Sequence, residues 1–214
     1  MPTRSDRSLL HVAAARAVPA REQQCALFRE GIERIRVLAD TAPVDWQATT
    51  PCAPWRARDL VAHLRCTAEE SYETLSRLLT GEPPAEVLSE RALAAHNERA
   101  LAALPTTDGR EHLARFIKAA DDYLALAEGA PGLWEQPAYT YRGEAWSVGH
   151  EVGVLAVEWQ VHAWDLAVSW GTTHRPTSPW QLARAFGAGM AYLSLAAGPD
   201  PWEAVLTASG RRAG

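Results

Sequence analysis

The chain has 214 residues, which is enough for one domain whose hydrophobic core forms without disulfides. Hydrophobic residues make up 47% and charged residues 22% of the sequence, which excludes a disordered chain, and no run of about 18 apolar residues predicts a transmembrane helix. The net charge is -5 and the basic residues are not clustered, so we expect neither nucleic acid nor a membrane as partner.

The cysteine content indicates a reducing compartment. The chain has three cysteines, Cys25, Cys52 and Cys66. This number is odd and too small for a scaffold held together by disulfides. The N-terminus has no continuous apolar segment of the kind found in secretory signals. We therefore expect a cytoplasmic protein.

The N-terminal quarter contains one amphipathic helix between two irregular segments. Residues 1–20 have no sustained periodicity and are predicted to be a loosely ordered extension, so that the domain itself covers residues 21–214. From Arg21 to Asp40, apolar residues recur at spacings of three and four, which predicts a helix. The segment Thr41–Trp55 contains three prolines and two tryptophans, a composition typical of an ordered loop.

The middle of the chain predicts three further helices. The first covers Ala57–Leu79 and the second covers Ser89–Leu104. The third follows Asp108, whose spacing to Glu111 resembles a capping box. The stretch Gly129–Trp146 is rich in glycine, proline and aromatic residues, so we expect another packed loop.

The C-terminal third predicts two more helices. Ser147 can cap a long helix that ends before Gly171. A last helix is predicted with Ser178 as its N-cap and Pro179 at its first position, ending at Gly198. Because alternating β-branched runs are few, strands should be scarce. The sequence therefore predicts an all-α fold, a helical bundle with extra short helices and long ordered loops.

Two segments far apart in the sequence carry a candidate metal site. Glu158 and His162 are four residues apart, so they lie on neighbouring turns of one helix face and can chelate one ion. His63, within an otherwise apolar stretch, can supply the third ligand. Imidazole and carboxylate suit zinc, nickel or another transition divalent, and three protein ligands leave a coordination position open for catalysis.

Each of these residues also has a structural interpretation. A Glu/His pair four residues apart is more often part of a solvated helix face than of a site. A single histidine such as His63 is more often a hydrogen-bonded core residue. The spacing alone leaves these alternatives open.

Two motifs resemble a known family. T-P-C-A-P-W-R-A-R-D-L-V-A-H-L, at Thr50–Leu64, and E-W-Q-V-H-A-W-D-L-A, at Glu158–Ala167, resemble the two signatures of the mycothiol-dependent maleylpyruvate isomerase N-terminal family. This family belongs to the DinB-like superfamily of metal-binding four-helix bundles. The resemblance covers Arg21 to about Ala197.

The resemblance implies a ligand set and a co-substrate. It implies that His63, Glu158 and His162 bind the metal, with zinc or nickel as the ion. Asp165 matches a family aspartate that could orient a neighbouring group, although a carboxylate that only joins helices is an equal alternative. The family also implies an actinobacterial source and mycothiol as co-substrate.

The chain departs from the family in two places. Arg56 replaces the usual threonine N-cap, so the start of the following helix is expected to shift or to rely on Asp59 alone. The isomerase after which the family is named has a second, C-terminal domain that contributes to its active site. Because about one helix is predicted after Gly171, we expect this chain to lack that domain.

Other residues near the predicted site have alternative roles. Cys66 could approach the metal as a thiolate, but a buried apolar role is favoured, and Cys52 is expected to be structural. His150 could line a cavity, although a position near solvent is favoured. Glu70 is expected to face solvent. Six tryptophans could build an aromatic pocket over the metal, but most are expected to anchor the core and loops: Trp46, Trp55, Trp134, Trp146, Trp159 and Trp164.

Three functions are compatible with these observations. The first is a metal-dependent thiol S-transferase or isomerase that acts on a small electrophile, because a metal lowers the pKa of a bound thiol. The second is a biosynthetic tailoring enzyme that uses the metal as a Lewis acid without a thiol. The third is a non-catalytic metal- or small-molecule-binding bundle. A small molecule is the expected partner in each case, and a homodimer is one of the assemblies that the sequence allows.

Overall fold

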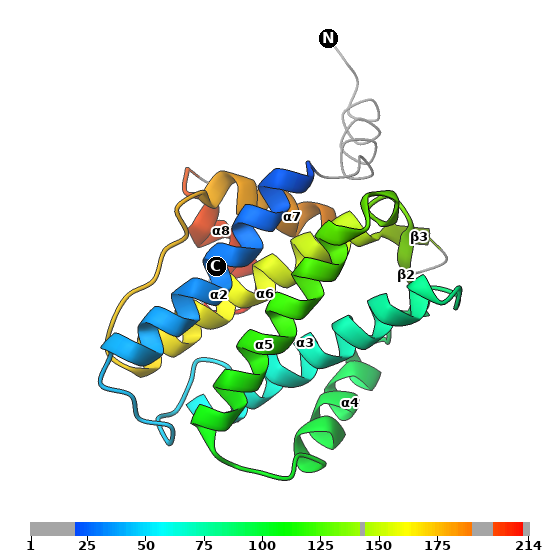
Figure 1. The fold of residues 1–214 in the computed structure, drawn as a ribbon. Coiled ribbons are helices and arrows are strands. Elements are labelled where there is room, and N and C mark those ends of the chain that lie inside the picture. The colour runs from blue at the N-terminus through cyan, green and yellow to red at the C-terminus, as the bar shows by residue number, and fades with distance from the viewer. Residues whose placement is uncertain (1–19, 142–143, 190–198, 212–214) are drawn as a thin grey trace.

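Four long helices form the body of the protein (Figure 1). The computed structural model describes residues 20–141, 144–189 and 199–211. The four helices are α2 (Arg21–Thr41), α3 (Ala57–Leu79), α5 (Gly109–Gly129) and α6 (Val148–Ser169). Where the sequence predicted the start or end of one of these helices, the observed boundary lies within a residue or two of it. The prediction of an all-α bundle is confirmed.

The bundle is built from two closely packed helix pairs, α2 with α6 and α3 with α5. The α2–α6 pair depends on Gly31, because a Cβ atom there would lie 2.6 Å from the Cβ of Trp159. Phe28 and Phe116 both pack edge-on against the fully buried Trp159 ring, which joins the two pairs in one core. The α3–α6 contact, between the pairs, is sparser, and this is where the candidate site lies.

Side chains at the helix starts explain the element boundaries. Ser89, Asp108 and Ser147 each accept a hydrogen bond from a backbone N–H in the first turn of the helix that follows. Helix α3 has no such N-cap side chain; instead, the carboxylate of Asp59 accepts from the backbone N–H of Arg56 at 3.0 Å. The expectation that this helix start relies on Asp59 alone is confirmed.

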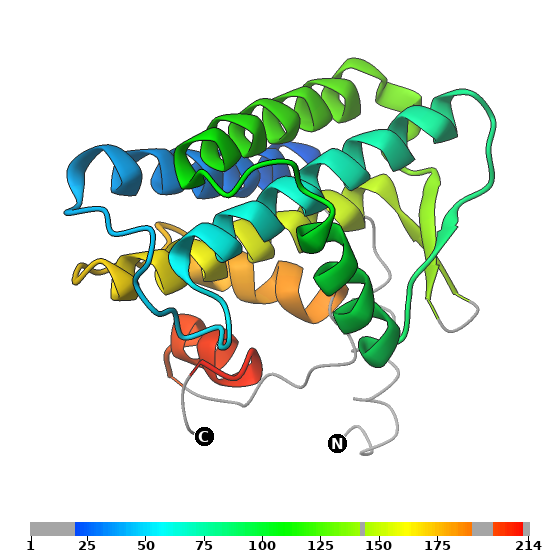
Figure 2. The ribbon, with the colours of Figure 1, turned by 90° about the horizontal axis from the view of Figure 1, so that it is seen from below.

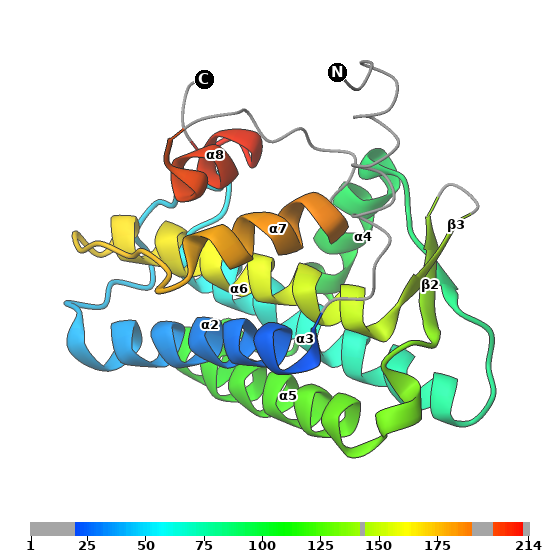
Figure 3. The same ribbon diagram turned by 90° about the horizontal axis from the view of Figure 1, so that it is seen from above.

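The prediction of a loop over Gly129–Trp146 was wrong. This stretch contains a 3₁₀ turn, η1 (Pro131–Leu133), and the strands β2 (Pro137–Tyr141) and β3 (Glu144–Ser147). The strands pair antiparallel, and the short strand β1 (Ala85–Glu86) pairs parallel with β2. Aromatic and β-branched residues favour a strand here over an irregular loop. The hairpin lies at the end of the bundle where α6 begins (Figure 3).

The C-terminal segment also differs from the prediction. Helix α7 (Pro179–Gly189) starts at the predicted proline, but its predicted end at Gly198 lies outside the described residues. A further helix, α8 (Pro201–Ala208), follows Asp200, whose side chain accepts hydrogen bonds from the first turn. An N-cap residue followed by proline is typical of a helix start, so this helix could have been predicted from the sequence. Figure 3 shows α7 lying along α6 with α8 beyond it.

Helix α4 (Glu90–Ala102) is shorter and lies across one side of the bundle against α3 (Figure 2). His96 on α4 contacts both carboxylate oxygens of Glu70 on α3 at 2.9 Å. The predicted N-terminal extension, apart from Ala20, lies outside the described residues. Within the described residues, none of the helices has the length and apolar character needed to cross a membrane.

Candidate metal centre

Helices α3 and α6 bring the three predicted ligands together. His63 lies in the second turn of α3, and Glu158 and His162 lie one turn apart in the middle of α6. One donor atom from each of the three side chains lies within 4.8 Å of the other two. The sequence separates His63 from the pair by almost a hundred positions, so only the packing of α3 beside α6 creates this group.

The imidazole of His162 is at the centre of the group. Its Nε2 lies 3.1 Å from a carboxylate oxygen of Glu158, and its ring centroid lies 5.4 Å from that of His63. His162 is buried, whereas His63 and Glu158 are half-buried. The ring of Trp55, from the loop before α3, packs against His63 at a centroid distance of 4.7 Å. The group is therefore enclosed on the His162 side and open to solvent beside His63 and Glu158.

Asp165 contacts the other nitrogen of His162. Its Oδ2 lies 2.8 Å from Nδ1, and the carboxylate is completely buried. A carboxylate in this position fixes the orientation of the ring and directs Nε2 toward Glu158. The structure thus places Asp165 where it can orient His162, one of the two roles that the sequence left open.

The C-terminal end of the chain contributes Arg211, which the sequence analysis missed. Its Nη2 donates to Asp165 Oδ2 at 2.9 Å and lies 3.5 Å from His162 Nδ1. Its Nη1 donates to the backbone carbonyl of Ser209 at 2.7 Å, which holds the guanidinium in place. The arginines after the last helix belong to no motif, so only the fold could reveal the position of Arg211.

Burial and neighbouring charges set the protonation of the group. Burial, with help from His162, lowers the pKa of His63 to about 4, so its imidazole is neutral at pH 7. Burial alone would raise the pKa of Glu158, but the hydrogen bond and charge of His162 outweigh it and lower that pKa. Burial likewise acts to lower the pKa of His162, but the bonds to Asp165 and Glu158 prevail and raise it.

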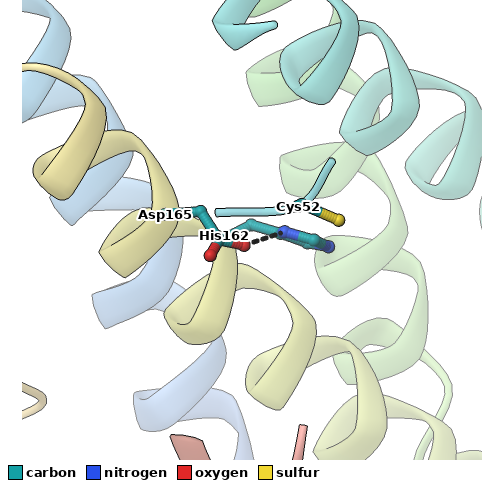
Figure 4. Close-up of side chains that lie close together, drawn as sticks. All are labelled: Cys52, His162 and Asp165. Carbon is teal, nitrogen blue, oxygen red and sulfur yellow. Dashed lines mark hydrogen bonds and ion pairs between the residues drawn. The ribbon is translucent and has the colours of Figure 1, made fainter. Parts of the chain in front are cut away.

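Cys52 lies beside the same histidine, from the loop that precedes α3 (Figure 4). Its Sγ, one nitrogen of His162 and one oxygen of Asp165 lie within 4.8 Å of one another. Burial raises the pKa of the Cys52 thiol, while Arg211 acts to lower it. The expectation that Cys52 is only structural therefore missed its place at the edge of the site.

Cys66 lies on α3, three residues after His63. It belongs to neither group of potential metal-binding donors among the described residues. Burial raises the pKa of its thiol, and the negative charges of Glu70 and Glu69 raise it further. The structure does not support Cys66 as a fourth ligand.

His150 does not face solvent, contrary to the favoured expectation. Its side chain is buried, its Nδ1 forms a hydrogen bond of 2.9 Å with Ser147 Oγ, and its ring packs edge-on against Trp146. His150, Trp146, Ala145 and Glu144 line a pocket of about 320 Å³. The alternative expectation, that His150 lines a cavity, is the correct one.

Most of the other expectations for individual side chains hold. Glu70 is exposed, as expected. Trp134 and Trp159 are core residues, and Trp46 packs edge-on against Trp170. Trp55 supplies the aromatic contact at the candidate metal centre.

The comparison with protein families agrees with the two motifs. The family model described as the mycothiol maleylpyruvate isomerase N-terminal domain matches residues 27–167. This range covers more than half of the chain and includes His63, Glu158, His162 and Asp165. The chain belongs to this family. Arg211 lies outside the matched range, in the part of this family member that follows the N-terminal domain.

One solved structure extends the likeness to nearly the whole chain. It is a crystal structure of a histidine-to-alanine mutant of the mycothiol-dependent maleylpyruvate isomerase, with a TM-score of 0.69 and 16% sequence identity. The match covers 91% of this chain and 90% of that chain. At this identity the likeness shows the fold alone. No curated protein matches the sequence significantly.

The coverage overturns one expectation. The chain was expected to lack the C-terminal domain of the isomerase, but the two chains correspond over nearly their full lengths. The prediction failed because it ended the last helix at Gly198 and did not interpret the residues that follow. Those residues form α8 and carry Arg211 to the candidate metal centre.

Proposed function

We propose that this family member is a metal-dependent enzyme that uses mycothiol, or a similar low-molecular-weight thiol, in S-transfer to a small electrophile or in its isomerisation. The observation that carries the proposal is the convergence of His63, Glu158 and His162 donor atoms within 4.8 Å, inside the region that defines the family. Zinc or nickel is the expected ion, because two imidazoles and one carboxylate suit these metals.

The charges of the group support a cation there. His162 lies between two carboxylates, Glu158 and Asp165, of which Asp165 is paired with Arg211. Among the described residues no arginine forms an ion pair with Glu158, although the charge of Arg211 acts on it, so a protonated His162 or a metal ion is needed to balance its charge at close range. His63 adds an imidazole that is neutral at pH 7, the form that binds metals. The donor set therefore fits a divalent ion held by His63, Glu158 and His162.

A bound divalent ion would lower the pKa of a thiol and supply an anionic nucleophile at neutral pH. The surrounding residues prepare the site for this chemistry. Asp165 accepts a hydrogen bond from His162 Nδ1, so the lone pair of Nε2 is directed to the side where Glu158 and His63 lie. Burial acts to raise the pKa of Asp165, but hydrogen bonds from His162 and Arg211 outweigh it and lower that pKa, and Arg211 also holds the carboxylate in place. Trp55 packs against one side of His63 and restricts the approach of water there.

A spectroscopic titration tests whether a thiol is used. In cobalt-substituted protein, saturating mycothiol should change the visible absorption spectrum, because a sulfur ligand alters the ligand field of the ion. The exposed-site variant Glu70→Gln serves as a control and should respond like the wild type. If mycothiol leaves the spectrum unchanged, the thiol mechanism is wrong and a Lewis-acid enzyme without thiol, or a binding protein, becomes the better account.

A further inference from the structure

A second group of polar and aromatic side chains lies at the hairpin end of the bundle. We call it the hairpin-end cluster, and it contains Ser71 of α3, Tyr123 of α5, Tyr139 of β2, Trp146 of β3 and Glu151 of α6. Of these residues, only Trp146 was among the candidates that the sequence suggested. Three helices and two strands bring them to one place, as Figures 1 and 2 show for the elements.

The members of the cluster are in mutual contact. Tyr123 and Ser71 both lie close enough to Glu151 to influence its pKa by hydrogen bonding. Tyr139 lies close enough to Tyr123 to influence the pKa of that phenol. The rings of Tyr139 and Trp146 stack with a centroid distance of 6.3 Å and an interplanar angle of 3°. The cluster is therefore continuous from Ser71 to Trp146.

Three polar atoms of the cluster are buried without a hydrogen bond of normal geometry: Tyr123 Oη, Trp146 Nε1 and Glu151 Oε2. Tyr123 is 0% exposed and Trp146 is 8% exposed. A buried polar group without a partner costs about 1–3 kcal/mol, so proteins rarely keep several together without a ligand or water to bind. Glu151 is only half-buried, which gives a ligand access to the cluster from its side.

The cluster lies on the same face of α6 as the candidate metal ligands. Glu151 precedes Glu158 by seven residues, which is almost two full turns and about 10 Å along the helix axis. Helix α3 runs in the opposite direction to α6 (Figure 1). Ser71, which follows His63 by eight residues on α3, is therefore displaced toward the same end of the bundle as Glu151. The pocket of about 320 Å³ that His150 and Trp146 line adjoins the cluster through Trp146. Glu151 and Ser71 therefore each lie about two helical turns from the candidate metal ligands on their own helix, toward the hairpin end.

The chemistry of the cluster favours an uncharged, hydroxyl-rich ligand. Tyr123 and Ser71 are the side chains that act on Glu151, and no basic side chain of the described residues does so, which disfavours an anion. A carboxyl group, two hydroxyls and an indole N–H can bind several hydroxyl groups at once. The aromatic faces of Tyr139 and Trp146 provide apolar surface of the kind that sugar rings contact.

We propose that the hairpin-end cluster is a subsite for the carbohydrate part of mycothiol, while the sulfur of the same molecule lies near His63. This inference rests on the proposed function, because the use of mycothiol as co-substrate is part of that proposal. It adds the part of the co-substrate that the protein distinguishes: a carbohydrate-bearing thiol should bind better than a simple cysteine derivative.

Calorimetric titration of the metal-loaded protein separates the subsite from the thiol chemistry. The ligands are mycothiol, S-methylmycothiol, which has no free thiol, and N-acetylcysteine, which has no carbohydrate. Glu151→Leu and Tyr123→Phe should each weaken the binding of S-methylmycothiol, Glu151→Leu by about tenfold, and leave N-acetylcysteine unchanged. The controls, Glu98→Leu and Tyr72→Phe, alter an exposed glutamate and an exposed tyrosine and should have no effect.

The outcomes are distinguishable. If both cluster variants bind S-methylmycothiol as the wild type does, or if the wild type does not bind it, the subsite is wrong. Tyr123→Phe keeps the ring in the core, so it tests the subsite even if Glu151→Leu does not fold. If the cluster variants weaken S-methylmycothiol but wild-type protein binds mycothiol no more tightly than its S-methyl form, the subsite is upheld and the proposed thiol function fails.

Discussion

The buried carboxyl of Glu151 predicts a pH-dependent loss of stability. Burial raises the pKa of Glu151 from 4.5 to about 7, although Tyr123 and Ser71 act to lower it. Between pH 4.5 and about pH 7, Glu151 keeps its proton in the folded protein but has released it in the unfolded chain. The free energy of unfolding therefore falls as pH rises, by about 1.4 kcal/mol per unit. The full interval corresponds to roughly 3 kcal/mol, and because the side chain is half-buried we expect about 1–2 kcal/mol.

The assay is urea denaturation of wild type and Glu151→Gln at pH 5 and pH 8. The amide has no proton to lose, so the variant should lose about 1–2 kcal/mol less stability than the wild type over this interval. The difference between the two proteins removes the contributions of bound metal and of the other titrating groups. Glu98→Gln, which changes an exposed carboxyl of α4, should behave like the wild type. If Glu151→Gln and wild type have the same pH dependence, the burial argument is refuted.

Two further substitutions test the packing around the site. Asp165→Asn removes the charge that pairs with Arg211 in a buried position, so urea denaturation should show a loss of roughly 2–3 kcal/mol, and a loss below about 0.5 kcal/mol would contradict the pairing. Gly31→Ala places a Cβ atom 2.6 Å from the Cβ of Trp159, so thermal denaturation should show destabilisation of roughly 1–3 kcal/mol. In the control Gly129→Ala, the new Cβ meets no atom within 4 Å, so this loss of stability should be absent.

The long helices could be predicted because local signals determine them. The apolar stripe of α2 and the caps at Ser89, Asp108 and Ser147 lie within one or two turns of the elements that they define. The hairpin was missed because its strands are short and one of its partners, β1, is distant in sequence. Such a pairing depends on where α3 and α6 place the two segments, and no local pattern records that.

The candidate site divides in the same way. The Glu158–His162 pair is a local helical pattern, and the family motifs connected it to His63, whose donor atom does lie nearby. Arg211 lies outside both motifs, and Cys52, although it belongs to the first motif, lies in the loop before α3, so no helical spacing rule could place either side chain at the site. Glu151 occupies the same helix face as Glu158, but the sequence could not show that Tyr123 and Ser71 would bury it.

The central claim is that His63, Glu158 and His162 bind one divalent metal ion, and elemental analysis of the purified protein tests it most directly. Wild-type protein should contain about one equivalent of zinc or nickel, and His63→Ala and His162→Ala should each lose it. His96→Ala, which alters a histidine on α4 outside the site, should keep the metal. Equal metal content in the wild type and in both site variants, or no metal in the wild type, would contradict the account.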